Sequence, residues 1–91
     1  MKIDWDARKA ASNLRKHGVS FEEAATCFDD PDGSYFRNDS PSYEDRLILI
    51  AFSAKRRLLF VVHAEVGRAN IRIVSARKAS ASQRRLYEGL E

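Results

Sequence analysis

Three apolar runs dominate the hydrophobic pattern of the chain, and short polar turns separate them. The runs are residues 47–52, 58–64 and 71–76. Runs of this length, rich in Ile, Val and Phe, predict an antiparallel three-stranded meander. Because both alternating faces of 47–52 are apolar, we expect this strand to be central and to be covered by helices on at least one side.

Helical patterns precede the meander. Residues 7–17 are rich in Ala, Lys and Arg, and Asp6 and Gly18 suit the two ends of a helix. A second helix is predicted after Ser20, because Glu23 follows at the spacing of a capping box.

The remaining elements are short. Residues 3–5 predict an opening strand or extended arm, and residues 34–36 a short strand. A last helix is expected over about 80–89, capped by Ser80 or Ser82. Together the elements indicate an α+β fold in which two N-terminal helices and a C-terminal helix pack on an antiparallel sheet.

Length and composition favour one ordinary domain over residues 1–91. The chain is 44% hydrophobic and 32% charged, and a chain of this size buries only about 60–65% of its unfolded surface. No apolar run approaches the roughly 20 residues of a membrane span, and the start lacks the apolar core of a signal peptide, so we expect a cytoplasmic protein. The single cysteine, Cys27, excludes an internal disulfide and is expected to fill the core.

The net charge of +3 conceals a division between the two halves of the chain. Residues 1–45 carry six Lys/Arg and ten Asp/Glu, a net of −4, whereas residues 46–91 carry ten and three, a net of +7. A basic half of this kind favours a nucleic-acid partner. The alternative is a solvated basic face that binds nothing.

The polar residues within the apolar runs suggest a chemistry that uses neither metal nor cofactor. There is no Gly-rich phosphate loop, no His-Glu-x-x-His helix and no spaced His/Cys set. Arg, Lys, His, Glu and Tyr can nevertheless cut RNA. The 2′-hydroxyl attacks the next phosphate while a base and an acid move protons and cations neutralise the phosphoryl oxygens.

Cations are the first requirement of that reaction. Arg46, Arg72 and Arg77 are the candidates, because the planar guanidinium fits a phosphate, and Lys78 adds a point charge. Simpler interpretations remain open. Arg46 follows two acidic residues and could form only a surface ion pair. Arg72 could be an ordinary outward-facing residue of a strand with one solvated face.

Proton transfer and substrate contact are the second requirement. His63 is the first candidate for proton transfer and Glu65 the second, while Tyr87 could stack on a base. The alternative for His63 is a structural histidine. Lys16 and His17 could contact substrate or simply stabilise the C-terminus of the first helix.

A longer set of residues resembles the BrnT family of toxins over nearly the whole chain. It begins with Trp5-Asp6-x-x-Lys9-x-x-x-Asn13-Leu14-x-Lys16-His17-Gly18-Val19-Ser20-Phe21-Glu22-Glu23-Ala24. It continues with Phe28-Asp29-Asp30-Pro31, Glu44-Asp45-Arg46, Leu58 to His63, Arg72-Ile73-Val74-Ser75-Ala76-Arg77-Lys78-Ala79 and Arg84-Arg85-x-Tyr87-Glu88. Residues 33–43 offer no motif to match, which leaves the substrate preference open.

The resemblance implies a fold similar to RelE-type ribonucleases and a metal-independent endoribonuclease toxin of a type II toxin–antitoxin pair that inhibits translation. It implies a BrnA-like, DNA-binding antitoxin, a heterotetramer or larger complex, and contact with operator DNA only through the antitoxin. The matched polar residues are Lys16, His17, Glu44, Arg46, His63, Arg72, Ser75, Arg77, Lys78 and Tyr87.

We expect the catalytic set to be Arg46, His63, Glu65, Arg72 and Arg77. The substrate-binding set is expected to be Lys16, His17, Lys78 and Tyr87. The alternatives are a non-catalytic nucleic-acid-binding module and an antitoxin-docking module with a basic sheet face.

Overall fold

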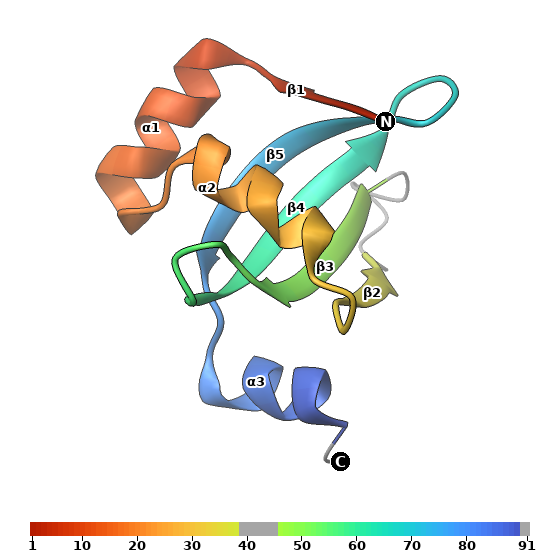
Figure 1. The fold of residues 1–91 in the computed structure, drawn as a ribbon. Helices are drawn as coiled ribbons and strands as arrows, with labels where there is room; N and C mark the ends of the chain where they lie inside the picture. The colour runs from red at the N-terminus through yellow and green to blue at the C-terminus, as the bar shows by residue number, and fades with distance from the viewer. Residues whose placement is uncertain (39–45, 90–91) are drawn as a thin grey trace.

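The computed structural model describes residues 1–38 and 46–89, in which one five-stranded sheet carries the helices (Figure 1). Its elements in chain order are β1 (Lys2–Trp5), α1 (Ala7–His17), α2 (Phe21–Thr26), the short 3₁₀ helix η1 (Cys27–Asp29), β2 (Ser34–Arg37), β3 (Arg46–Phe52), β4 (Leu58–Glu65), β5 (Asn70–Lys78) and α3 (Ala81–Glu88). The expected α+β class is confirmed.

The sheet is mixed, whereas an antiparallel sheet was expected. Strands β3, β4 and β5 form the predicted antiparallel meander, and β2 adds to β3 in the same sense. The order is β1-β5-β4-β3-β2, and the edge strand β1 runs parallel to β5. The residue pattern of 3–5 predicts an extended segment, but it carries no signal for a partner that lies almost at the other end of the chain.

The ends of α1 follow from local chemistry. The Asp6 carboxylate accepts hydrogen bonds from the backbone N–H groups of Arg8 and Lys9 at 2.8 and 3.1 Å. Gly18 ends the helix with φ of 68°, a left-handed conformation that only glycine adopts without strain. The predicted bounds 7–17 are confirmed.

The cap of α2 differs in part from the expected capping box. Ser20 Oγ accepts from the Glu23 N–H at 3.0 Å, as predicted. The Glu23 carboxylate does not return to Ser20; it accepts from Ser53 Oγ at 2.6 Å and forms a two-point ion pair with Arg57. These bonds tie α2 to the turn between β3 and β4, and the Arg57 guanidinium lowers the pKa of Glu23.

The hydrophobic core lies between the sheet and the two N-terminal helices. Its buried members are Val19, Phe21, Ala24, Cys27, Leu49, Ala51, Leu59, Val61, Ile73 and Ala76. We call the side of the sheet that packs on these helices the helix face. Burial raises the pKa of the Cys27 thiol to about 12, which agrees with its predicted role as a core filler.

The C-terminal helix α3 lies beside the end of β3 and has no fully buried residue (Figure 1). Ser80 caps it through a complete capping box with Gln83, which decides between the two predicted caps. The Tyr87 hydroxyl donates to Asp30 Oδ2 at 2.9 Å, and the Tyr87 ring packs edge-on against Phe52. A few polar and ring contacts therefore hold this helix.

Among residues 1–38 and 46–89, no helix is long and apolar enough to cross a membrane.

Candidate functional site

The three predicted arginines lie on one face of the sheet, opposite the helix face. Arg46 on β3 and Arg72 on β5 are both cross-strand partners of Ala64 on β4. Arg77 is the partner of Phe60, which lies on the same side as Ala64 because side chains alternate along a strand. We call this side the arginine face.

A β-bulge brings Arg72 and Arg77 onto this common face. The two residues are five positions apart, so regular alternation would place them on opposite sides of β5. The register between β4 and β5 shifts at Val62/His63, where Val62 pairs with Ser75 and His63 with Ile73. Val74, between Ile73 and Ser75, has no partner on β4 and reverses the alternation. Arg77 therefore points to the same side as Arg72.

The environments of these arginines differ. Arg72 Nε donates to Asp4 Oδ1 at 3.0 Å, and both side chains are about half exposed. This bond lowers the pKa of Asp4 and raises that of Arg72. The Arg77 guanidinium lies over the Phe60 ring, 4.7 Å from its centroid. A polar ligand can compete for Arg72, because an exposed ion pair is weak.

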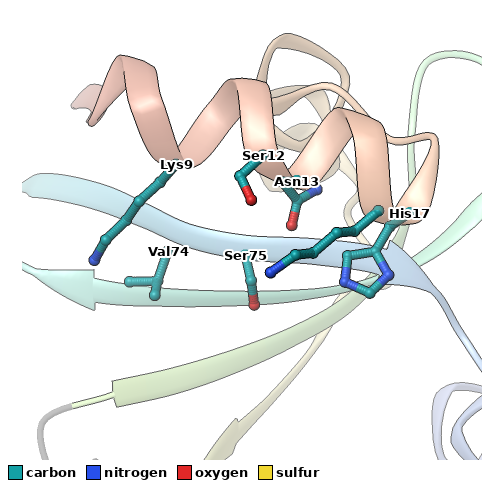
Figure 2. A pocket seen from close by; sticks show the side chains of 7 residues that line it. Lys9, Ser12, Asn13, His17, Val74 and Ser75 are labelled. Atoms are coloured by element: carbon teal, nitrogen blue, oxygen red, sulfur yellow. The ribbon is translucent and has the colours of Figure 1, made fainter.

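Two shallow hollows adjoin on β5 beside these arginines. The first, the α1 hollow, is lined by Lys9, Ser12, Asn13, Lys16, His17, Val74 and Ser75 (Figure 2). The second, the β3 hollow, is lined by Asn38, Arg46, Val62, Val74 and Ser75. Since they share Val74 and Ser75, the cationic side chains of α1 and of β3 border one groove, which we call the basic groove.

The helix α1 presents its cations to the groove because of their spacing. Lys9, Lys16 and His17 are separated by seven and eight positions, close to two helical turns, so they lie on one side of the helix. Figure 2 shows Lys9 and His17 reaching from α1 toward the strand that carries Val74 and Ser75. The predicted Lys16 and His17 thus line the same groove as the predicted Arg46.

The structure separates His63 from the arginines. His63 is only 1% exposed on the helix face, where its ring packs edge-on against Phe28 at 4.9 Å and Tyr35 at 6.0 Å between centroids. Its Nδ1 has no hydrogen-bond partner among the described residues. Burial lowers the pKa of His63, so the neutral form is favoured. By alternation Glu65 points to the same side as His63.

Two other predicted substrate contacts lie outside the basic groove. Tyr87, on α3, donates its hydroxyl hydrogen bond to Asp30. Burial together with this carboxylate raises the pKa of Tyr87 to about 12. Lys78 is the exposed last residue of β5. Glu44, which the family resemblance also matched, lies outside the described residues.

The structure adds groove residues that sequence reasoning did not select. Lys9, Ser12 and Asn38 line the hollows. Lys9 and Asn13 belong to the N-terminal motif, and the spacing of Lys9 from Lys16 along the helix was a usable signal. Asn38 had none, because it lies at the start of a polar segment without a motif.

No group of three or more His, Cys, Asp or Glu side chains within residues 1–38 and 46–89 is arranged to hold a metal ion.

Comparisons with known proteins agree on one family. Residues 5–83 match the family model described as "Ribonuclease toxin, BrnT, of type II toxin-antitoxin system". Among solved structures, the chain is similar to the ribonuclease toxin BrnT of Brucella abortus, with a TM-score of 0.71 and 28% sequence identity over 88% of this chain and 97% of that chain. No curated protein matches with significance.

Proposed function

Because this chain belongs to the BrnT family of ribonuclease toxins of type II toxin–antitoxin systems, we propose that it cuts RNA bound along the basic groove and the adjoining arginine face, without a metal ion. One observation carries the proposal. Arg46 and Arg72 flank the small Ala64 on a sheet face that the α1 and α2 helices leave uncovered.

The pair Arg46 and Arg72 suits a single phosphate. Their backbones are two strand spacings apart, about 10 Å, and both side chains are long enough to reach toward the space above Ala64. Ala64 is partly exposed and carries only a methyl group, so an anion can come closer to the sheet there than above a larger residue. Arg77 lies opposite Phe60, four residues along β4 or roughly 13 Å by strand rise, and serves a neighbouring phosphate.

The proposed reaction begins with attack by the RNA 2′-oxygen on the adjacent phosphorus. A base takes the 2′-hydroxyl proton, the bond from phosphorus to the 5′-oxygen breaks, and an acid protonates that leaving oxygen. The products are a 2′,3′-cyclic phosphate and a free 5′-hydroxyl. Arg46 and Arg72 stabilise the negative charge on the phosphoryl oxygens during the displacement.

We propose His17 as a proton-transfer group, as the alternative to the His63 predicted from sequence. His17 is the imidazole that lines the groove, whereas His63 must leave its buried position to reach an RNA bound there. The two assignments predict opposite results. If His17 acts, His17→Ala lowers kcat and His63→Leu leaves it within a few-fold of the wild-type value.

The central experiment incubates purified protein with total RNA in EDTA. We expect cleavage by the wild type and a loss of about 100-fold or more in kcat/KM for Arg46→Ala and Arg72→Ala, since each removes a charge-stabilising group. Arg85→Ala is the matched control, because Arg85 is an exposed arginine on α3 outside both hollows. Bound but intact RNA would instead establish a non-catalytic nucleic-acid-binding module.

We propose further that the toxin inhibits translation in the cytoplasm and is neutralised by a BrnA-like, DNA-binding antitoxin in a heterotetramer or larger complex. Operator DNA is then contacted only through the antitoxin. Growth arrest on expression of this chain alone, with rescue by the adjacent gene, tests the pair. Growth without arrest would favour a docking module that lacks activity. The RelE-type fold is a proposal of the same kind, which superposition on such a ribonuclease tests.

A further inference from the structure

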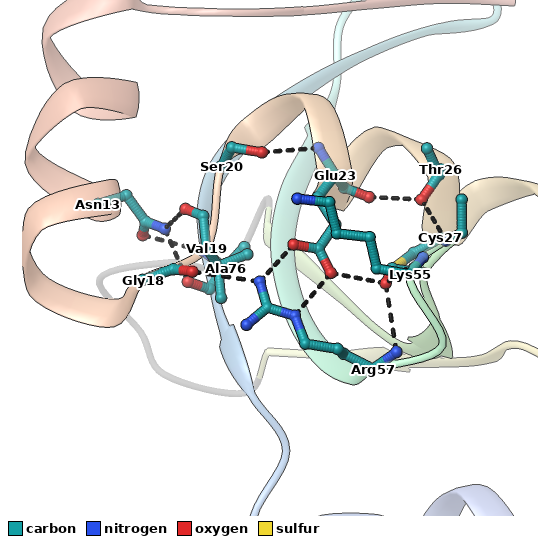
Figure 3. Close-up of polar contacts among 12 residues, drawn as sticks. Asn13, Gly18, Val19, Ser20, Glu23, Thr26, Cys27, Lys55, Arg57 and Ala76 are labelled. Carbon is teal, nitrogen blue, oxygen red and sulfur yellow. Dashed lines mark hydrogen bonds and ion pairs between the residues drawn. The ribbon is translucent and has the colours of Figure 1, made fainter.

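Asn13 has a buried side chain on α1 that is bonded to backbone at two distant places (Figure 3). It is only 6% exposed. Its Nδ2 donates to the carbonyl oxygens of Val19 at 2.9 Å and Ala76 at 2.7 Å, and its Oδ1 accepts from the Ala76 N–H at 3.0 Å. Every polar atom of the amide is therefore used, and two of the three bonds reach β5.

The need for this side chain follows from the sheet topology. Strand β1 ends at Trp5, which pairs with Ile73, so the outer edge of β5 has no strand partner at Ala76. Buried backbone N–H and C=O groups that lack a partner destabilise the folded state. The Asn13 amide supplies one donor and one acceptor to Ala76, as one residue of an additional strand would.

The position of Asn13 on the helix makes this bond relevant to the basic groove. Lys9 lies four residues before it, and Lys16 and His17 lie three and four residues after it, so all three are its neighbours on the helix surface. Val74 and Ser75 directly precede Ala76 on β5. The amide thus joins the two walls of the α1 hollow at its base.

We propose that Asn13 is a positioning residue of the ribonuclease: it sets the distance between the α1 cations and the Val74–Ser75 wall, and so the width of the groove in which RNA phosphates lie. The proposal rests on the proposed function. Asn13 acts through Lys9, Lys16 and His17 and needs no contact with the RNA itself.

Thr26 offers a matched control for the removal of side-chain bonds to backbone. Its Oγ1 donates to the Glu23 carbonyl at 2.6 Å and accepts from the Ala54 N–H at 2.8 Å, and it therefore ties α2 to a turn of the sheet (Figure 3). Thr26 lines neither hollow of the basic groove. Thr26→Val removes these bonds with little change of shape.

The experiment compares Asn13→Leu, Asn13→Ser and Thr26→Val with the wild type, at a temperature well below every melting midpoint. We expect all variants to melt earlier. Only the Asn13 variants should fall about tenfold or more in kcat/KM, largely through KM. Their plot of log affinity for single-stranded RNA against log salt should also flatten, by about 0.7 for each phosphate that the groove no longer neutralises.

Each outcome has a defined meaning. Unchanged KM and salt slope in the folded Asn13 variants, or an equal fall in Thr26→Val, would overturn the positioning role. Failure of both Asn13 variants to fold would overturn it too, because Asn13 would then be a folding residue. A wild-type protein that neither binds nor cuts RNA would refute the proposed function itself, a result visible before any variant is made.

Discussion

Ala64 is the small residue at the centre of the proposed phosphate position. It lies between Arg46 and Arg72 on the arginine face and is partly exposed. Arg46 and Arg72 carry the positive charge, and the size of the residue 64 side chain limits how close an anion can come to the sheet. A larger residue at this position would fill the space without altering either arginine.

The substitution Ala64→Val tests this view. Valine suits a strand, and this face is not part of the helix-side core, so we expect the fold to be kept. We expect RNA affinity to fall several-fold, because the two extra methyl groups occupy the proposed phosphate position. Fluorescence titration with a labelled RNA measures the decrease, and an unchanged melting midpoint confirms that the effect is local. An unchanged affinity would place the phosphate elsewhere.

Asp4 competes with RNA for the Arg72 guanidinium in the proposed site. The ion pair is exposed and weak, yet it neutralises one of the two flanking cations. Asp4→Asn keeps the shape and removes the charge, so RNA affinity should rise a few-fold at low salt and less at high salt. Titrations at two salt concentrations measure it. A fall in affinity would mean that Asp4 orients Arg72 for binding.

His63 should make stability depend on pH. Its folded pKa is lowered by burial, so the unfolded chain binds more protons below pH 6.5 and stability falls as the pH drops from about 6.5 through the folded pKa. Each unit between the two pKa values is worth about 1.4 kcal/mol. Urea unfolding at pH 8 and pH 5 should show this loss of stability in the wild type.

The variant His63→Leu should lose less stability over the same pH interval. The pKa values of Glu23 and Asp30 are also lowered, but these carboxyl groups change stability mainly below about pH 4.5. Between pH 8 and pH 5 the expected change in stability therefore comes from histidine. An equal decrease in both proteins would assign the dependence to another group.

At the scale of elements, local signals predicted most of the fold. Asp6 and Gly18 bound α1 as expected, Ser80 caps α3, and the three apolar runs form the meander. These features depend on neighbours within a few positions. The parallel pairing of β1 with β5 depends on residues at opposite ends of the chain, and no local pattern encodes it.

The candidate site was harder to predict, because its geometry turns on one inserted residue. Without the bulge, strict alternation puts Arg72 and Arg77 on opposite sides of β5. Alternation along β4 predicts that His63 lies on the same side as Leu59 and Val61. It does not predict which of the two apolar sides of the sheet the helices cover. The sequence therefore named the three arginines as one candidate group, but it could not show that they share a sheet face or that His63 lies on the opposite face.

The docking of α3 gives a test at this scale. The Tyr87 hydroxyl is bonded to Asp30, so Tyr87→Phe should cost about 1 kcal/mol of folding free energy and leave RNA cleavage unchanged. The substrate-contact role predicted from sequence gives the opposite result, with reduced cleavage and little change in stability. Chemical unfolding and a cleavage assay on the same preparation decide between them.

At the scale of the whole molecule, the charge pattern predicts a salt-sensitive interaction. Among the described residues, Lys9, Lys16 and Arg46 border the basic groove, and Arg72 and Arg77 are the other two predicted arginines on the arginine face. If each neutralises one phosphate of single-stranded RNA, log affinity should fall with log salt with a slope of roughly −3.5. Filter binding at several salt concentrations gives the slope. A slope near zero would exclude RNA as the ligand of this face.

The pairing of β1 with β5 also determines when, during synthesis of the chain, the basic groove can form. Asp4 and Arg72, which are 68 positions apart, come together only after β5 has been synthesised. A nascent chain that has been synthesised only as far as β4 contains α1 but lacks Val74 and Ser75 of β5, which form the other wall of the α1 hollow. The basic groove needs both α1 and β5, so it forms only after β5 has been synthesised and has paired with β1.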